Sequence, residues 1–380
     1  MHGTLGWQWV ESTNPDFTRK SRANDKNRKG SLMGGSEETG GGALEAAFER
    51  AKRAGLTLSV HFELTRRCNL RCRHCYVCGA DDKARREMSA SQVFRALDVL
   101  AESGTLFVTF TGGEPLLRRD FFEIAERAAK KNFAVRIFTN GTLIDEAAAD
   151  RIAALNPLEV GISVYGATAE THDGITMSPG SFDKSVAALH ALLARGVPST
   201  VKSVIMKPNF GEYGALIDMA LEMGAKYVFD TTVFPRDDGG REPLELRLDD
   251  DMLAATLEDE RLSGREPGKP APDICRGPVC DLSTATAGLS PEGDIFPCLQ
   301  LRKLMGNINE IDSLGEIRDA WMDIISGLTR ETDIEKRYNC EYKRYCARCP
   351  GLAELEDGSA TGPSQWACRA ARLRAKAKKK

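Results

Sequence analysis

The stretch CNLRCRHCY, residues 68–76, contains three closely spaced cysteines: Cys68, Cys72 and Cys75. Thiolate sulfur binds zinc and iron, and four such ligands would complete a zinc site or hold all four irons of a cluster. Three thiolates leave one coordination position open for an exchangeable ligand. The spacing C-x3-C-x2-C therefore predicts a four-iron cluster with one free iron, or a zinc site that His74 or Cys78 completes.

A second motif, TGGEPLL, contains Gly112, Gly113, Glu114 and Pro115 at the end of a predicted strand. Two glycines at a strand end let the backbone approach a ligand closely, and proline fixes the turn. Such a turn alone is common between a strand and a helix. Its position, one strand-and-helix unit after the cysteine loop, indicates that the two motifs belong to one site.

The 11 cysteines of the 380-residue chain form two groups about 200 residues apart. No apolar stretch is long enough to span a membrane, and the first residues lack the apolar centre of a signal peptide, so we expect a cytoplasmic protein. In a reducing compartment, metal or redox chemistry explains grouped cysteines better than disulfides do. The formal net charge of −3 favours neither nucleic acid nor a membrane surface as a partner.

Short β-rich runs alternate with amphipathic helical runs between residues 56 and 235. The strands are predicted within 56–65, 106–112, 134–141, 158–166, 199–207 and 226–234, and the helices within 89–104, 121–131, 145–155, 181–196 and 211–224. Such units build a parallel sheet with right-handed crossovers. Because six strands fall short of the eight of a closed barrel, we predict a partial (β/α)6 TIM-like barrel, with a doubly wound sheet as the alternative. Both folds place functional groups at the carboxyl ends of the strands.

The rest of the chain divides by composition. Residues 1–55 are predicted to be a flexible N-terminal segment, because Gly, Ser, Asn and charged residues dominate most of it. Residues 236–269 are predicted to be a linker with a helix, and residues 373–380 a basic tail. Residues 270–372 have little apolar periodicity and contain seven cysteines, so their fold is expected to depend on metal.

The run CNLRCRHCY followed by GGEP resembles the radical S-adenosylmethionine (SAM) superfamily, over residues 56–235. The resemblance implies that Cys68, Cys72 and Cys75 bind a [4Fe–4S] cluster whose fourth iron is chelated by the amine and carboxylate of SAM. It also implies that one electron cleaves SAM to methionine and a 5′-deoxyadenosyl radical, which abstracts a hydrogen from the substrate.

The same resemblance assigns residues to SAM. Gly112, Gly113 and Glu114 would line the methionine amino group, and Tyr76 would contribute to the adenine pocket. Ser163 and Lys202 occupy strand positions where such enzymes often hold the ribose or the carboxylate. A buried strand hydroxyl and an exposed strand-end lysine are the alternatives for these two residues.

The rear of the chain resembles a SPASM domain, a module that carries auxiliary iron–sulfur clusters. The resemblance rests on Cys280-x12-Gly293-x4-Cys298, with a hairpin turning at Pro291–Asp294, and on CEYKRYCARCPG. It implies one closed auxiliary [4Fe–4S] cluster and three corners of a second, held respectively by Cys275, Cys280, Cys298 and Cys349, and by Cys340, Cys346 and Cys368.

The rear cysteines depart from the family pattern in two places. Arg337 stands where a cysteine is expected, and the gap between Cys346 and Cys349 is one residue shorter than usual. Arginine cannot replace a thiolate. The second auxiliary cluster therefore has an open iron, takes a ligand from elsewhere, or is lost. A pair of zinc ribbons is the alternative for this region.

SPASM-type radical SAM enzymes mostly modify peptides or proteins, so the resemblance predicts an oxidoreductase that matures a ribosomally synthesised peptide (RiPP). A small-molecule enzyme, either an aminocyclitol dehydrogenase or a tetrapyrrole-modifying enzyme, is one alternative. A non-catalytic iron–sulfur electron-transfer or binding protein is another, although an electron carrier needs no open iron. The expected partners are a precursor peptide, a separate leader-binding protein and a flavodoxin or ferredoxin-type electron donor, with no nucleic acid and no membrane.

Overall fold

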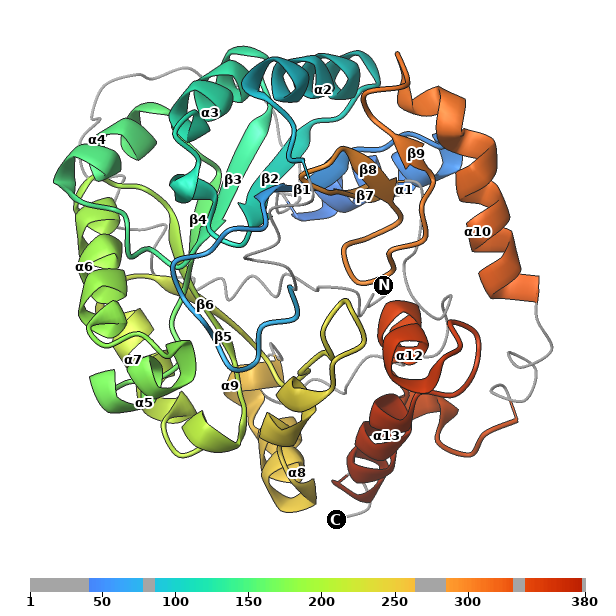
Figure 1. Cartoon of the computed structure of the whole chain (residues 1–380). Helices are drawn as coiled ribbons and strands as arrows, with labels where there is room; N and C mark the ends of the chain where they lie inside the picture. The colour runs from blue at the N-terminus through green and yellow to red at the C-terminus, as the bar shows by residue number, and fades with distance from the viewer. Residues whose placement is uncertain (1–40, 78–85, 264–284, 331–338, 378–380) are drawn as a thin grey trace, which may run out of the picture.

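The computed structural model describes residues 41–77, 86–263, 285–330 and 339–377 (Figure 1). Its centre is one sheet in the order β6-β5-β4-β3-β2-β1-β7-β8-β9. The first six strands pair in parallel, each with the next one along the chain. They are β1 (Ser59–Thr65), β2 (Phe107–Gly112), β3 (Ala134–Thr139), β4 (Glu159–Ser163), β5 (Ser199–Val204) and β6 (Lys226–Asp230). The predicted parallel, partial barrel is confirmed.

Helices cover the outer side of the curved sheet, as Figure 1 shows. Those that connect its strands are α2 (Ala90–Glu102), α3 (Phe121–Lys130), α4 (Glu146–Ala154), α5 (Ala169–Thr176), α6 (Ser181–Ala194) and α7 (Tyr213–Glu222). Ser89 and Asp145 cap α2 and α4, because each side chain accepts a hydrogen bond from a backbone N–H of the first turn. Of these six connecting helices, only α5 was not predicted from the sequence, since the stretch that forms it has little apolar periodicity.

Side chains along the strands alternate between the core beneath the helices and the inside of the barrel. Val60, Phe62 and Leu64 of β1 are buried in the core beneath the helices, as are Val108 and Phe110 of β2. Successive strand residues point to opposite faces, so the residues between these face the inside of the barrel. The register aligns four of them in one row that is largely polar: His61, Thr109, Arg136 and Glu159.

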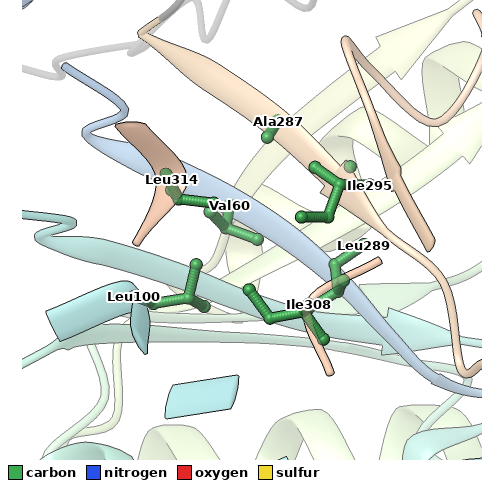
Figure 2. Close-up of a pocket in the computed structure, with 8 residues that line it drawn as sticks. Val60, Leu100, Ala287, Leu289, Ile295, Ile308 and Leu314 are labelled. Carbon is green, nitrogen blue, oxygen red and sulfur yellow. The ribbon is translucent and has the colours of Figure 1, made fainter. Parts of the chain in front are cut away.

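Three strands of the C-terminal region extend the same sheet. They are β7 (Thr286–Leu289), which pairs in parallel with β1, and the antiparallel β8 (Asp294–Phe296) and β9 (Gly306–Asn307). Pairing of Leu289 with Ile295 confirms the predicted hairpin. Its attachment to β1 was not predicted. Figure 2 shows Val60, Leu100, Ala287 and Ile308 in the apolar contact where these strands meet β1 and α2, and the gap among them has no room for a water molecule.

Helix α1 (Gly41–Ala54) lies within the segment that was predicted to be flexible as far as residue 55. Its order has a physical reason: the Phe48 ring stacks on Phe107 at 5.8 Å between centroids, and Ala51 is buried with Leu58. The prediction was therefore wrong for residues 41–54, while residues 1–40 lie outside the described part.

The remaining helices follow the barrel. They are α8 (Asp250–Glu258), α9 (Glu260–Ser263), α10 (Arg318–Arg330), α12 (Pro350–Asp357) and α13 (Gln365–Ala377). Short 3-10 turns lie within the barrel, at η1 (Pro115–Leu117) and η2 (Lys207–Asn209), and after it, at η3 (Glu242–Leu246), η4 (Leu314–Ile317) and η5 (Lys343–Tyr345). Trp366 and Leu373 of α13 pack against Leu253 of α8. Helix α13 continues through most of the predicted basic tail. None of the helices described here is long and apolar enough to cross a bilayer.

Candidate active site

The loop with the first three cysteines follows β1 directly and is held against the end of α5. The backbone N–H groups of Arg71 and Arg73 donate to the carbonyl oxygens of Thr176 and Ile175, both at 3.0 Å. Within the loop, Cys75 N–H donates to the Cys72 carbonyl at 3.0 Å. Helix α5, which the sequence analysis missed, therefore fixes the loop at the carboxyl edge of the sheet.

The three thiols share one site. Burial is the main cause that raises the pKa of Cys72, and the neighbouring sulfurs of Cys75 and Cys68 raise it further. Cys68 Sγ accepts hydrogen bonds from Leu70 N–H at 3.5 Å and Asn140 Nδ2 at 3.9 Å. Donors aimed at sulfur stabilise a thiolate, which is the form that binds metal.

The donor set fits an iron–sulfur cube better than a single ion. Within the described ranges, no three His, Cys, Asp or Glu side chains are grouped closely enough to hold one metal ion. A cube separates its thiolates, because each binds a different iron. The His74 ring lies edge-on against Tyr165 at 4.4 Å between centroids, and its burial lowers its pKa to about 4. Cys78, the other zinc ligand considered, lies outside the described residues.

The two glycines of the GGEP turn bring it against the backbone that enters the cysteine loop. Gly113 N–H donates to the Thr65 carbonyl at 2.7 Å, and Glu114 N–H donates to the Arg67 carbonyl at 2.8 Å. A Cβ on Gly112 would lie 2.3 Å from the Thr65 oxygen, and one on Gly113 would lie 2.3 Å from the Arg67 oxygen. The close approach that these glycines allow is therefore made to the backbone that enters the cysteine loop.

Glu114 joins this turn to the end of β3. Its buried carboxylate accepts hydrogen bonds from Thr139 Oγ1 and Asn140 N–H at 2.8 Å and from Leu116 N–H at 3.0 Å. Burial raises the pKa of Glu114 to about 7, although these hydrogen bonds act in the opposite direction and lower it. Asn140 also donates to Asn69 Oδ1 at 2.9 Å, besides its contact with Cys68. Glu114 therefore positions the residue that supports the first thiol.

Thr139 and Asn140 were missed by the sequence analysis. Their signal was available in FTNG, where two short polar side chains end the strand that follows the GGEP motif in the chain. Parallel strands bring their carboxyl ends together, so these side chains belong to the same edge as Cys68.

Of the other residues assigned to SAM, two lie on neighbouring strands and the third, Tyr76, lies in the cysteine loop. Ser163, the last residue of β4, is paired in register with Lys202 inside β5. The Lys202 ammonium lies 4.2 Å from the centre of the Phe138 ring, and burial lowers its pKa to about 8. Gly161 leaves room for this side chain, because a Cβ there would lie 2.6 Å from Lys202 Cδ. Tyr76 accepts a hydrogen bond at its carbonyl from Asp237 N–H at 2.9 Å.

A largely buried ion network links the barrel to the C-terminal region, and no sequence motif predicted it. Arg302 donates to both carboxylate oxygens of Glu63 at 2.9 and 3.0 Å. Arg66 donates to Glu292 at 2.9 Å and to Asp237 at 3.2 Å. The five side chains come from β1, the loop after it, the segment after β6 and the region around the hairpin. The network therefore ties the site's edge to the C-terminal strands.

The rear cysteines that the structure describes approach in pairs. Burial and then the Cys349 sulfur raise the pKa of Cys298 to about 11, and burial and then Cys340 raise the pKa of Cys368. Leu301 N–H donates to Cys298 Sγ at 3.3 Å, and Leu352 N–H to Cys349 Sγ at 3.4 Å. Cys346 is half-buried at the end of η5. Cys275, Cys280 and Arg337 lie outside the described residues.

Comparison with known proteins agrees with this geometry. The family described as the Radical SAM superfamily matches residues 62–234. Mycofactocin maturase MftC of Mycobacterium ulcerans is 30% identical over 276 residues, which cover 69% of this chain and 73% of that protein. The AdoMet-dependent heme synthase of Methanosarcina barkeri is 27% identical over 327 residues, which cover 79% of this chain and 93% of that protein. Six other curated relatives are matched over 41–46% of their own length.

Among solved structures, Streptococcus suis SuiB bound to its precursor peptide SuiA matches with a TM-score of 0.65 at 16% identity. The match covers 93% of this chain and 87% of that one, so the likeness of fold is not confined to the barrel. By its motifs, its matched family and its relatives, the chain belongs to the radical SAM superfamily.

Proposed function

We propose that this protein is a SPASM-type radical SAM oxidoreductase that matures a peptide, most simply a ribosomally synthesised precursor. The cluster and SAM, when bound, would supply one-electron cleavage of SAM and hydrogen-atom abstraction from the peptide, with methionine and 5′-deoxyadenosine as the products. The observation that carries the proposal is the shared site of Cys68, Cys72 and Cys75, supported by the GGEP turn and Asn140.

The three thiolates would hold a [4Fe–4S] cluster, which supplies the electron and a free iron for the amine and carboxylate of SAM. The chain's own residues orient and enclose this chemistry. Glu114 and Asn140 keep Cys68 in place. The residues we propose for SAM are Tyr76, Gly112, Gly113, Glu114, Ser163 and Lys202.

The peptide assignment is supported by the maturase relative and by the fold shared with SuiB, which binds its precursor peptide. To test it, the anaerobically reconstituted protein is incubated with SAM, dithionite and the short peptides encoded beside its gene. We expect one peptide to stimulate 5′-deoxyadenosine formation and to change in mass. A peptide set that neither stimulates the reaction nor changes in mass would contradict the assignment.

Tetrapyrrole modification is the second candidate, favoured by the match that covers 93% of the Methanosarcina barkeri heme synthase. The same assay with Fe-coproporphyrin III in place of peptide separates the two. A change of its absorption spectrum together with stimulated SAM cleavage would assign the tetrapyrrole activity.

We further propose two auxiliary sites: Cys275, Cys280, Cys298 and Cys349 in one, and Cys340, Cys346 and Cys368 in the other. The approach of Cys298 to Cys349, and of Cys340 to Cys368, supports this division. Exchange of Cys298 and Cys349 for alanine is expected to remove about four irons per chain, the content of one cube, while uncoupled SAM cleavage persists. Iron analysis and 5′-deoxyadenosine assays check this. Unchanged iron content, or zinc in the wild type, would contradict it.

A separate leader-binding protein and a cytoplasmic location also remain part of the proposal. A flavodoxin or ferredoxin-type electron donor is likewise part of it.

A further inference from the structure

A row of polar side chains lies inside the barrel, below the strand ends that carry the two motifs. The register places its members side by side on four neighbouring strands: His61 of β1, Thr109 of β2, Arg136 of β3 and Glu159 of β4, called here the polar inner row. Each lies three or four residues before the end of its strand, which is roughly 10–13 Å below the carboxyl edge. The polar inner row is therefore the deeper part of the same barrel whose edge carries the cysteine site.

Aromatic rings cover the row on the side of the amino ends of the strands. Phe107 precedes Thr109 by two residues, so both side chains are on the inner face of β2. The Phe48 ring of α1 stacks on Phe107, and the Arg136 guanidinium lies 5.3 Å from the centre of the same Phe107 ring. Even so, the side chains of Arg136 and Glu159 keep 18% and 13% of their surface exposed. The row is thus supported from beneath and still accessible, as a binding site requires.

The row holds polar atoms that the protein does not satisfy. Thr109 is fully buried, yet no residue of the described ranges forms a hydrogen bond with its Oγ1. Glu159 Oε1 is also buried without a hydrogen-bond partner in that part of the chain, whereas Oε2 lies 3.7 Å from Arg136 Nε. Buried oxygens without a partner cost free energy and are rare in folded proteins. A ligand that donates to one oxygen and accepts from the other would account for both.

Positive charge predominates at this level of the barrel. Arg136 belongs to the row, and the Lys202 ammonium reaches the Phe138 ring, 4.2 Å from its centre. The His61 ring lies against the same Phe138 ring, at 6.4 Å between centroids. Burial, and then the charges of Lys202 and Arg136, lower the pKa of His61 to about 4, so its imidazole is neutral. Two cations are therefore balanced by one carboxylate, that of Glu159, and an anionic ligand would be attracted.

We propose that the polar inner row binds a carboxylate of the peptide substrate, with Arg136 as the counter-charge and Thr109 Oγ1 as a hydrogen-bond donor. The inference rests on the proposed function, because it names the part of the substrate that the barrel recognises. A carboxylate accepts hydrogen bonds from guanidinium and hydroxyl groups alike. The peptide is thereby selected for an acidic residue or for its own C-terminus.

The remaining polar groups favour a peptide as the source of this carboxylate. Glu159 Oε1 needs a donor, and the backbone N–H of an acidic or C-terminal residue lies close enough to its carboxylate to supply one. A tetrapyrrole propionate has no such N–H beside it. Glu63, the carboxylate of the next inward-facing residue on β1, is already engaged, because Arg302 donates to both of its oxygens.

Binding to the reconstituted full chain with SAM, measured anaerobically by isothermal titration calorimetry, tests the proposal without turnover. The probes are the peptides encoded beside the gene. Each is compared with its C-terminal amide and with analogues that carry Asn or Gln in place of its acidic residues. Fe-coproporphyrin III and its tetra-amide form the second arm. We expect one peptide to lose affinity about tenfold or more when one particular carboxylate becomes an amide, as loss of a hydrogen bond between charged groups implies.

Two variants connect this preference to the row. In Arg136→Gln, the affinity for the acidic peptide should fall about tenfold or more, while the affinity for its amide analogue stays constant. Thr109→Val removes a hydroxyl that no described residue bonds, so denaturant unfolding should show equal or greater stability. The same variant should bind the acidic peptide about threefold more weakly. A residue with only a structural role would not separate the two forms of the peptide.

Arg151→Gln is the matched control. Arg151 also lies over a phenylalanine ring, 3.9 Å from the centre of Phe122, and pairs with Glu126 at 3.4 Å, but it is exposed on α4. This variant should bind every probe as the wild type does.

Equal affinity of the wild type for the carboxylate and amide forms of every peptide, or an equal loss in Arg151→Gln, would overturn the proposal. Carboxylate-dependent binding of Fe-coproporphyrin III alone, lost in Arg136→Gln, would overturn the peptide as the source and assign the row to a propionate. If the wild type shows the expected preference for the acidic peptide but does not cleave SAM with dithionite, the proposed function fails while the carboxylate site stands.

Discussion

Alanine at Cys68, Cys72 and Cys75 together is expected to abolish 5′-deoxyadenosine formation. The three sulfurs share one site, and two hydrogen-bond donors are aimed at the first of them, Cys68 Sγ; without thiolates neither iron nor SAM has a place there. After anaerobic reconstitution we expect roughly eleven or twelve irons per wild-type chain and about four fewer in the triple variant, from the content of one cube per site. Iron and sulfide analysis, with chromatography of the SAM products, measures both.

The Cys298→Ala/Cys349→Ala chain is the matched control, because it also removes buried thiols but from the rear of the molecule. It should lose a similar amount of iron and keep uncoupled SAM cleavage. Cleavage that survives in the front triple variant would show that the electron reaches SAM from another site. About eight irons in the wild type would indicate that only one auxiliary cluster forms, in agreement with the arginine at position 337.

Gly113→Ala is expected to have the second largest effect. Its methyl group would lie 2.3 Å from the Arg67 carbonyl oxygen and 2.5 Å from that of Arg66, both backbone atoms that cannot turn away. Relief requires the turn and the cysteine loop to separate, which breaks the hydrogen bond from Glu114 N–H to Arg67. We expect a loss of stability of about 1–3 kcal/mol, loss of the iron bound at the front site, and little SAM cleavage. Denaturant unfolding and iron analysis measure these effects.

Gly211→Ala is the control for this substitution, because nothing lies within 4 Å of the added methyl group. It should leave unfolding and iron content unchanged. If Gly113→Ala binds as much iron as the wild type, the turn is not the support of the loop that the hydrogen bonds indicate.

Local pattern was sufficient to predict the six parallel strands and the placement of both motifs at one edge. The runs around β1 to β6 alternate strictly enough, and end clearly enough at turns, that each was found from its own residues. The same holds for the hairpin of β7 and β8, because its turn residues are local. The family resemblance then assigned chemistry that spacing alone left open between iron and zinc.

Contacts between distant segments could not be predicted from local pattern. From the sequence, Glu114 was predicted to belong to a turn that contacts a ligand. Its hydrogen-bond partners, Thr139 and Asn140, lie at the end of the next strand. Arg302 and Glu63 meet across 239 positions of sequence, and neither stands in a motif. Helix α1 was taken for flexible chain because glycines precede it, and only the packing of Phe48 on Phe107 explains its order. Each of these features depends on a partner that no local window contains.

The pairing of β1 with β7 has a consequence for how the chain is made. Ser59 lies opposite Thr286, so β1 keeps one edge open until residues 286–289 have been synthesised. Such a long-range partner slows folding and exposes the nascent sheet to association with other chains. The cysteine loop is attached to that same strand. Delivery of iron and sulfide is therefore best timed after synthesis ends, and a chain released before residue 286 would present a sheet edge adjacent to three reactive thiols.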